Sequence, residues 1–166
     1  MTDDRPRSEA ETVAAIAALP GVVAETASSA SGAPEVAWGD TFFFHDPGGD
    51  GDRRFPFATL VTKDYPGFDE FSDLERPGVY RVNVHAGSER FTELLGFPPR
   101  EFDQHREGLD FAETDRLLPH PVYGGQGWVS VVVPGARTWT DLLQLVEHAR
   151  LRAGRRQERR KAGPPQ

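Results

Sequence analysis

The sequence predicts a single α+β domain, in which an antiparallel sheet packs against an N-terminal and a C-terminal helix. A chain of 166 residues fits one domain and can bury a sizeable core. Its central part holds segments that alternate apolar and polar residues, joined by loops of hairpin length. Amphipathic helical patterns flank these segments at both ends of the chain, which is typical of helices packed on one face of an antiparallel sheet.

The first predicted element is a helix that begins after Ser8. Ser8 and Glu11 have the spacing of a capping box, in which each side chain accepts a hydrogen bond from the other residue's backbone N–H. Apolar residues then recur at helical spacing until Pro20 and Gly21 end the pattern. Residues 22–24 can begin a short strand.

A β-hairpin is predicted after a flexible connection at residues 28–34. The segment TFFFH, residues 41–45, forms its first strand, and the loop DPGGDGDRR follows. The segment FPFATLVTK, residues 55–63, forms the returning strand. Pro56 has no N–H to donate, so it is expected at the start of that strand or on a sheet edge.

The acidic segment at residues 64–78 contains too many turn-forming residues for a helix or a strand. It is predicted to be an ordered loop anchored by Phe68, Phe71 and Leu74. The segment at residues 78–86 then alternates as a strand does.

Three further elements complete the predicted fold. A helix capped by Ser88 runs to Gly96. The segment WVSVVVP, residues 128–134, is predicted to be a strand because it is rich in β-branched residues. The last helix begins at Thr138 and carries one apolar stripe.

Residues 154–166 are predicted to be a disordered basic tail, so the folded domain is placed at residues 1–153. The tail has no apolar residue larger than alanine, and therefore it cannot offset its ordering entropy by burial. From Arg150 onward there are seven basic residues and one acid, whereas residues 1–149 carry 12 basic and 25 acidic residues. The acidic body repels nucleic acid, so nucleic-acid binding is expected only through the tail. A solvated basic terminus is the simpler alternative.

Several kinds of chemistry are excluded or not expected. The chain has no cysteine, which excludes disulfides, thiolate metal sites and a cysteine nucleophile. The five histidines lack the spacing of metal-binding motifs, and the acids of DPGGDGD miss the register of a calcium-binding loop, so no metal and no cofactor are expected. The first twenty residues lack the pattern of a signal peptide and no apolar run is long enough for a membrane helix. A cytoplasmic location without membrane contact is therefore expected.

One face of the predicted sheet gathers polar side chains. In the strand at residues 78–86, Arg81, Asn83 and His85 point to one side and the alternate residues to the other. If the strands are neighbours, this face could form a concavity for a small polar or anionic ligand, with Arg81 holding a carboxylate or phosphate through two hydrogen bonds. The alternative is a face exposed to water, as is common in antiparallel sheets. The candidate ligand-binding residues are Arg81, Asn83, His85, His45, His120, Tyr123, Trp128 and Ser130.

His120 lies between Pro119 and Pro121, which restrict the backbone around it. A histidine on a stiff segment suits a ligand-binding or catalytic role, and it equally suits a buried corner of the fold. No Gly-x-Ser-x-Gly pattern places a nucleophile, so no catalytic residue is assigned. The preferred function is a non-catalytic small-ligand or protein-interaction module. The alternatives are a nucleic-acid-associated domain and a hydrolase-like or transferase-like enzyme that uses His120.

Four segments occur in a characteristic order: TFFFHDP, RRFPFATLV, SDLERPGVYRVNV and DRLLPHPVYGGQGWVSVVVP. Together they resemble a family of uncharacterised actinobacterial domains of unknown function, over residues 8–152. More loosely, a Pro-x-Tyr followed by a tryptophan-led strand and a terminal helix is similar to the MmcQ/YjbR-like double-wing proteins. The second resemblance implies an α+β domain and an association with DNA binding, against which the acidic body argues. Neither family supplies catalytic residues.

Overall fold

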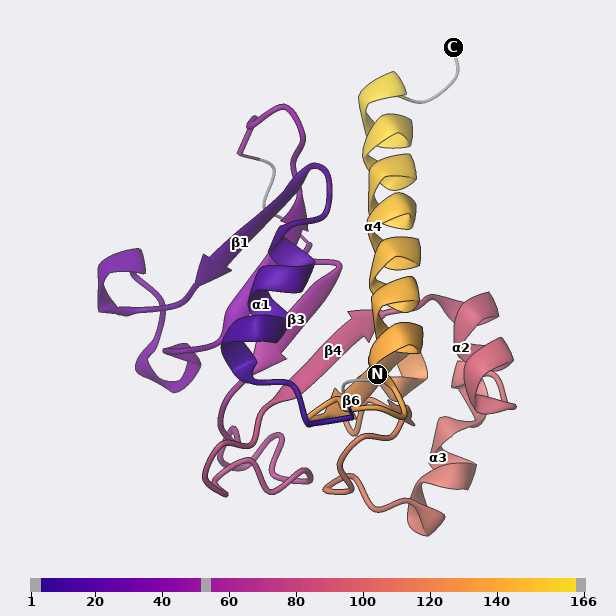
Figure 1. The fold of residues 1–166 in the computed structure, drawn as a ribbon. Helices are drawn as coiled ribbons and strands as arrows, with labels where there is room; N and C mark the ends of the chain where they lie inside the picture. The colour runs from indigo at the N-terminus through magenta and orange to yellow at the C-terminus, as the bar shows by residue number, and fades with distance from the viewer. Residues whose placement is uncertain (1–3, 52–54, 164–166) are drawn as a thin grey trace.

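The computed structural model describes residues 4–51 and 55–163, and Figure 1 shows how their elements are arranged. Within these residues the chain forms one six-stranded antiparallel sheet and four α-helices. The strands are β1 (Val22–Thr26), β2 (Thr41–His45), β3 (Ala58–Val61), β4 (Arg81–His85), β5 (Leu118–Pro119) and β6 (Trp128–Val132), in the order β1-β2-β3-β4-β6-β5. The helices are α1 (Glu9–Ala17), α2 (Ser88–Leu95), α3 (Phe102–His105) and α4 (Trp139–Ala162). The predicted fold class is therefore confirmed.

Helix α1 begins as the sequence predicts. The Ser8 side chain accepts a hydrogen bond from Glu11 N at 3.1 Å, and the Glu11 carboxylate accepts one from Ser8 N at 3.4 Å. On the buried side of the helix, Thr12 Oγ1 and Tyr80 Oη form a 2.8 Å hydrogen bond. The capping box sets where α1 begins, and Thr12 ties the helix to the residue that precedes β4.

The sheet is built by antiparallel pairing between neighbouring strands. Strands β2 and β3 form the predicted hairpin, in which Phe43 is opposite Ala58. Strand β4 pairs with β3 on one side and with β6 on the other, so that Val84 is opposite both Ala58 and Val129. Because side chains alternate along each strand, these four residues share one face of the sheet, and the residues between them lie on the other face.

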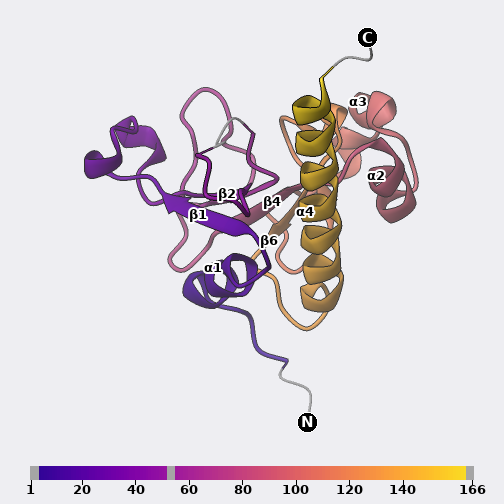
Figure 2. The same ribbon diagram turned by 90° about the horizontal axis from the view of Figure 1, so that it is seen from above.

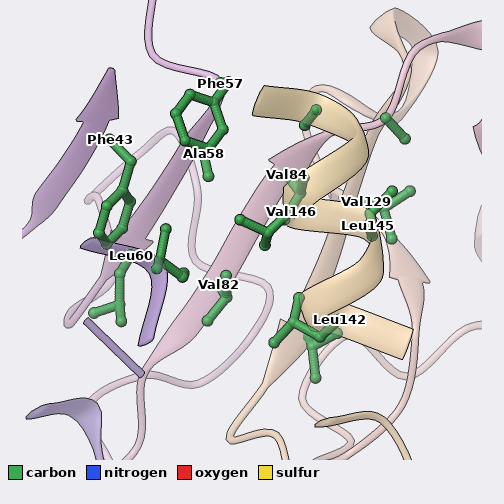
Figure 3. Close-up of a cluster of buried hydrophobic side chains, with 14 of the residues drawn as sticks. Phe43, Phe57, Ala58, Leu60, Val82, Val84, Val129, Leu142, Leu145 and Val146 are labelled. Atoms are coloured by element: carbon green, nitrogen blue, oxygen red, sulfur yellow. The ribbon is translucent and has the colours of Figure 1, made fainter. Parts of the chain in front are cut away.

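The hydrophobic core lies between this apolar face and helices α1 and α4, which lie on the same side of the sheet (Figures 1 and 2). Figure 3 shows Phe43, Leu60 and Val82 of the sheet gathered with Leu142 and Val146 of α4. All five side chains are at most 1% exposed. Full burial of each such side chain stabilises the fold by about 1.5–3 kcal/mol, so the contacts between this face and α4 contribute strongly to the stability of the fold.

The prediction of a disordered tail at residues 154–166 is wrong for residues 154–162, which belong to α4. The helix continues to Ala162, and residues 164–166 lie outside the described residues. The last turns consist of good helix formers, and they also contact the sheet, because Gln157 Nε2 donates a hydrogen bond to the carbonyl of His45. None of the helices in the described residues, α4 included, is long and apolar enough to cross a membrane.

The start of two helices differs in detail from the prediction. The N-cap of α2 is Gly87, and Ser88 is the first helical residue. Thr138 is the N-cap of α4 as predicted, but its side chain makes no capping hydrogen bond. Instead the Asp115 carboxylate accepts hydrogen bonds from Thr138 N at 3.0 Å, Thr138 Oγ1 at 2.6 Å and Gly135 N at 2.8 Å. The start of α4 is stabilised by a residue that is distant in sequence.

Candidate functional site

A cavity of about 270 Å³ opens on the face of the sheet opposite α1 and α4. We call it the aromatic cavity. Its polar lining residues are mostly buried and its aromatic ones are more exposed, so it has a polar floor and aromatic walls. The floor is formed by Thr59, Asp69, Arg81, Asn83 and His120, and the walls by Phe42, Phe68, Tyr123 and Trp128.

The loop at residues 64–78 covers this face of the sheet because Arg81 holds it there. Arg81 Nη2 donates to Asp69 Oδ2 at 2.6 Å, and Nη1 donates to Asp69 Oδ1 at 3.2 Å and to Ser72 Oγ at 2.8 Å. Arg81 is 1% exposed, and Asp69 and Ser72 are buried with it. The polar face is therefore not open to water as the alternative interpretation expected.

The predicted anchors of this loop are only partly buried. Leu74 is buried, whereas Phe68 and Phe71 are 50% and 47% exposed. The anchors that sequence reasoning missed are polar. Since the facing sheet residue is a buried arginine, a carboxylate and a hydroxyl are needed to satisfy it, and Asp69 and Ser72 supply them.

The guanidinium of Arg81 also contacts residues outside the loop. Besides its contacts with the loop, Nε donates to Asn83 Oδ1 at 2.7 Å, and Nη2 lies 3.2 Å from His120 Nε2. The carboxylate that Arg81 holds through two hydrogen bonds belongs to Asp69 of the same chain, not to a ligand. Arg81 therefore positions the wall of the aromatic cavity.

Asn83 extends this network across the sheet. Its Oδ1 also accepts a hydrogen bond from Ser130 Oγ at 2.8 Å, and its Nδ2 donates to Thr59 Oγ1 at 3.0 Å. Because two donors meet Oδ1, the orientation of the amide is fixed. Adjacent strands β3, β4 and β6 are thereby joined through their side chains under the cavity.

His120 occupies a buried corner beside Arg81 and is 4% exposed. Its Nδ1 accepts hydrogen bonds from the backbone N–H groups of Val122 at 3.0 Å and Tyr123 at 2.9 Å. A neutral imidazole carries one N–H, so these two donors place the proton on Nε2, which lies 3.9 Å from Asp69 Oδ2. Burial, and then the charge of Arg81, lowers the pKa of His120 well below 6.5. The ring is therefore neutral and presents an Nε2–H.

A second buried carboxylate supports the edge of the cavity. Asp40 is completely buried, and it accepts hydrogen bonds from Tyr65 Oη and from Thr62 N, the latter at 2.8 Å. Burial raises the pKa of Asp40, and burial together with the Asp40 carboxylate raises that of Tyr65. Tyr65, which lines the cavity, is therefore held as a protonated phenol.

The aromatic walls meet at the mouth of the cavity. The ring centroids of Phe68 and Tyr123 are 6.0 Å apart, and those of Tyr123 and His120 are 5.0 Å apart. Phe68 is 50% and Tyr123 is 37% exposed. Large aromatic rings with this much free surface beside a cavity can pack against the face of a planar molecule.

The structure brings together six of the eight candidate residues. Arg81, Asn83, His120, Tyr123 and Trp128 line the aromatic cavity, and Ser130 lies beneath it, bonded to Asn83. It separates the other two. His45 lies on the opposite face, where its Nδ1 is 2.9 Å from Gln157 Oε1 of α4. His85 lies at the end of β4, stacked on Trp128 with ring centroids 5.2 Å apart, and lines a second cavity.

Sequence reasoning missed the contribution of residues outside the central strands. Phe42 and Thr59 lie in the hairpin, and Tyr65, Phe68 and Asp69 lie in the loop. One signal in the sequence could have indicated the role of the loop. The acidic loop at residues 64–78 comes directly before the strand that carries Arg81, and an acidic residue of the loop can pair with this arginine. In the described part of the chain, no three His, Asp or Glu side chains are grouped so that they could hold a metal ion.

Comparisons with known proteins bear on the family of the chain and not on its activity. The sequence profile of DUF6194, a family of unknown function, matches residues 7–162. No curated protein and no solved structure matches the chain. The actinobacterial origin and the similarity to double-wing proteins stay predictions.

Proposed function

Because the chain belongs to DUF6194, a family of unknown function, we propose its function from the geometry of the aromatic cavity alone: it binds a small planar ligand that carries hydrogen-bond acceptors on its edge. The observation that carries this proposal is a buried polar floor surrounded by partly exposed aromatic rings. Apolar walls with a few convergent polar groups are typical of small-molecule sites.

The charges in the floor favour a neutral ring over an anion. The positive charge of Arg81 is compensated by the Asp69 carboxylate at 2.6 Å, and His120 is neutral. An anion bound against Asp69 would face an uncompensated repulsion in a partly desolvated site. A neutral ligand avoids this cost.

The floor offers mainly hydrogen-bond donors. The Asn83 amide has two N–H groups, and one of them bonds to Thr59 within the described residues. The Thr59 hydroxyl accepts that bond, so its own hydrogen can be donated to a ligand. Carbonyl or ring-nitrogen acceptors on the edge of a flat molecule would satisfy these two groups while its faces contact Phe68 and Tyr123.

The contacts of His120 favour binding over catalysis. Its Nδ1 is occupied by two backbone donors, and its Nε2 faces a guanidinium at 3.2 Å. A general base needs a free nitrogen within reach of the proton that it abstracts. His120 is therefore assigned a structural and ligand-positioning role.

We expect neutral nucleosides and free nucleobases, used as probes of planar ligands, to raise the melting temperature of the protein. Phe68→Ala is expected to weaken binding of the best probe about tenfold, because stacking of a ring on an aromatic side chain contributes about 1–3 kcal/mol. Phe71→Ala is the matched control, since Phe71 lies in the same loop, is equally exposed and does not line the cavity.

Both variants are to be compared by thermal shift and by isothermal titration calorimetry. The proposal is contradicted if no probe binds the wild-type protein, or if Phe68→Ala and Phe71→Ala bind the best probe with the same affinity.

A further inference from the structure

A second cavity, of about 240 Å³, lies next to the aromatic cavity. We call it the arginine cavity. Pro56 and Trp128 line both cavities, so these two residues lie at the boundary between them. On the far side of the indole, the arginine cavity is lined by His85 at the end of β4 and by Ala153 and Arg156 of α4. A molecule that extends from the aromatic cavity past Trp128 would also contact the arginine cavity.

Two arginines of α4 meet at His85. Arg156 Nη2 is 2.8 Å from His85 Nδ1, and Arg152 Nη1 donates to the His85 carbonyl at 3.3 Å. Burial, then Arg156 and Arg152, lowers the pKa of His85 to about 4, so its ring is neutral and accepts the hydrogen bond from Arg156. His85 thereby holds the Arg156 guanidinium at the cavity.

Within the described residues, no carboxylate compensates the charge of these two guanidinium groups. Among residues 4–51 and 55–163, no carboxylate forms an ion pair with Arg152 or Arg156, in contrast to Arg150, which pairs with Glu147 at 2.7 Å. Burial and the neighbouring arginines lower the pKa of both side chains. Arg156 is partly buried and lines the cavity, so its planar N–H groups can bind the oxygens of a phosphate. Arg152 lies beside it, bonded to the same histidine.

We propose that the arginine cavity is a phosphate subsite, and that the ligand of this protein is a planar ring that bears a phosphate, of the nucleoside monophosphate class. This inference rests on the proposed function, because the ring occupies the aromatic cavity on the other side of Trp128. The phosphate is bound by Arg156, with Arg152 adding positive charge. The two cavities thus divide the recognition of one ligand into a neutral part and an anionic part.

The test measures the affinities of AMP, GMP, CMP and UMP, of the four matched nucleosides and of inorganic phosphate for the full chain by isothermal titration calorimetry. The preferred monophosphate is expected to bind at least about tenfold more tightly than its nucleoside, because charge-assisted hydrogen bonds to the phosphate add to the binding free energy. Arg156→Gln is expected to reduce the affinity for the monophosphate to that of the nucleoside on the wild-type protein.

Arg155→Gln is the matched control, because it removes the same charge from the adjacent residue of α4, which is exposed and lines neither cavity. It is expected to leave the gain from the phosphate intact. Arg156→Lys, which keeps the charge, is expected to retain part of this gain and separates loss of charge from loss of folding.

Each contrary outcome has a distinct meaning. If nucleosides bind and the phosphate adds nothing, the phosphate subsite is overturned and the proposed function stands. If neither nucleosides nor monophosphates bind, both fail. If Arg155→Gln and Arg156→Gln weaken the binding of the monophosphate equally, the attraction is diffuse along α4 and the phosphate subsite is overturned. The same conclusion holds if a single-stranded oligonucleotide binds more tightly than any monophosphate and loses affinity equally in both variants.

Discussion

Replacing Asp69 by alanine is expected to lower the free energy of unfolding by about 3–5 kcal/mol, because it leaves the buried Arg81 guanidinium charged and without a carboxylate. Arg81 is 1% exposed, and Asp69 supplies two of its hydrogen bonds. Urea denaturation of the wild-type protein and of Asp69→Ala measures the difference in the free energy of unfolding. Glu70→Ala, at the exposed neighbouring position in the same loop, is the control and is expected to have little effect.

The same experiment separates a charge effect from a packing effect. In the double variant Asp69→Ala with Arg81→Met, no buried charge is left unpaired, so part of the lost stability is expected to return. The account of this network is wrong if Asp69→Ala lowers the free energy of unfolding by no more than Glu70→Ala does.

Because Asp69 also holds the loop at residues 64–78 over the sheet, Asp69→Ala is expected to abolish binding in the aromatic cavity.

Lowering the pH from 7.5 to 5 is expected to destabilise the protein, with His120 contributing up to about 2 kcal/mol. In the unfolded chain His120 takes up a proton near pH 6.5, whereas burial and the charge of Arg81 keep the folded residue neutral. The unfolded state therefore binds more protons below pH 6.5. Stability is complete above that pH and decreases by up to about 1.4 kcal/mol per pH unit as the pH falls toward the lowered pKa of the folded state.

A variant of His120 tests this assignment. His120→Gln is expected to reduce the difference in unfolding free energy between pH 7.5 and pH 5. The pKa of His85 is lowered to about 4, so His85 adds a loss of the same sign that persists in His120→Gln. An identical pH dependence in His120→Gln and in the wild-type protein would contradict the assignment.

The parts of the fold that local sequence signals specify were predicted well. The capping box of Ser8 and Glu11 identified the start of α1, and the alternation of apolar and polar residues identified β4. The sheet followed from the hairpin and from the strand that begins at Trp128. These elements depend on hydrogen bonds and side-chain periodicities within a few residues.

The parts that depend on distant contacts were not predicted. The segment TFFFH is aromatic on both sides, so alternation alone could not show that His45 faces α4. Residues 154–162 appeared unable to fold because they bury little apolar surface, but Gln157 and Arg156 find polar partners on β2 and β4. Likewise, Arg81 was expected to bind a ligand, and its partner Asp69 comes from a loop 12 residues earlier in the chain.

The side-chain N–H signals of the protein test most directly whether the aromatic cavity binds the ligand. The three tryptophan indole N–H groups give separate signals in a ¹H–¹⁵N NMR spectrum, and Trp38 and Trp139 lie outside both cavities. On titration with the nucleoside monophosphate that binds best, we expect the Trp128 indole and the Asn83 amide to shift and the Trp38 and Trp139 indoles to stay in place. If the Trp128 and Asn83 signals do not move, or if all three indoles move alike, the aromatic cavity is not the binding site.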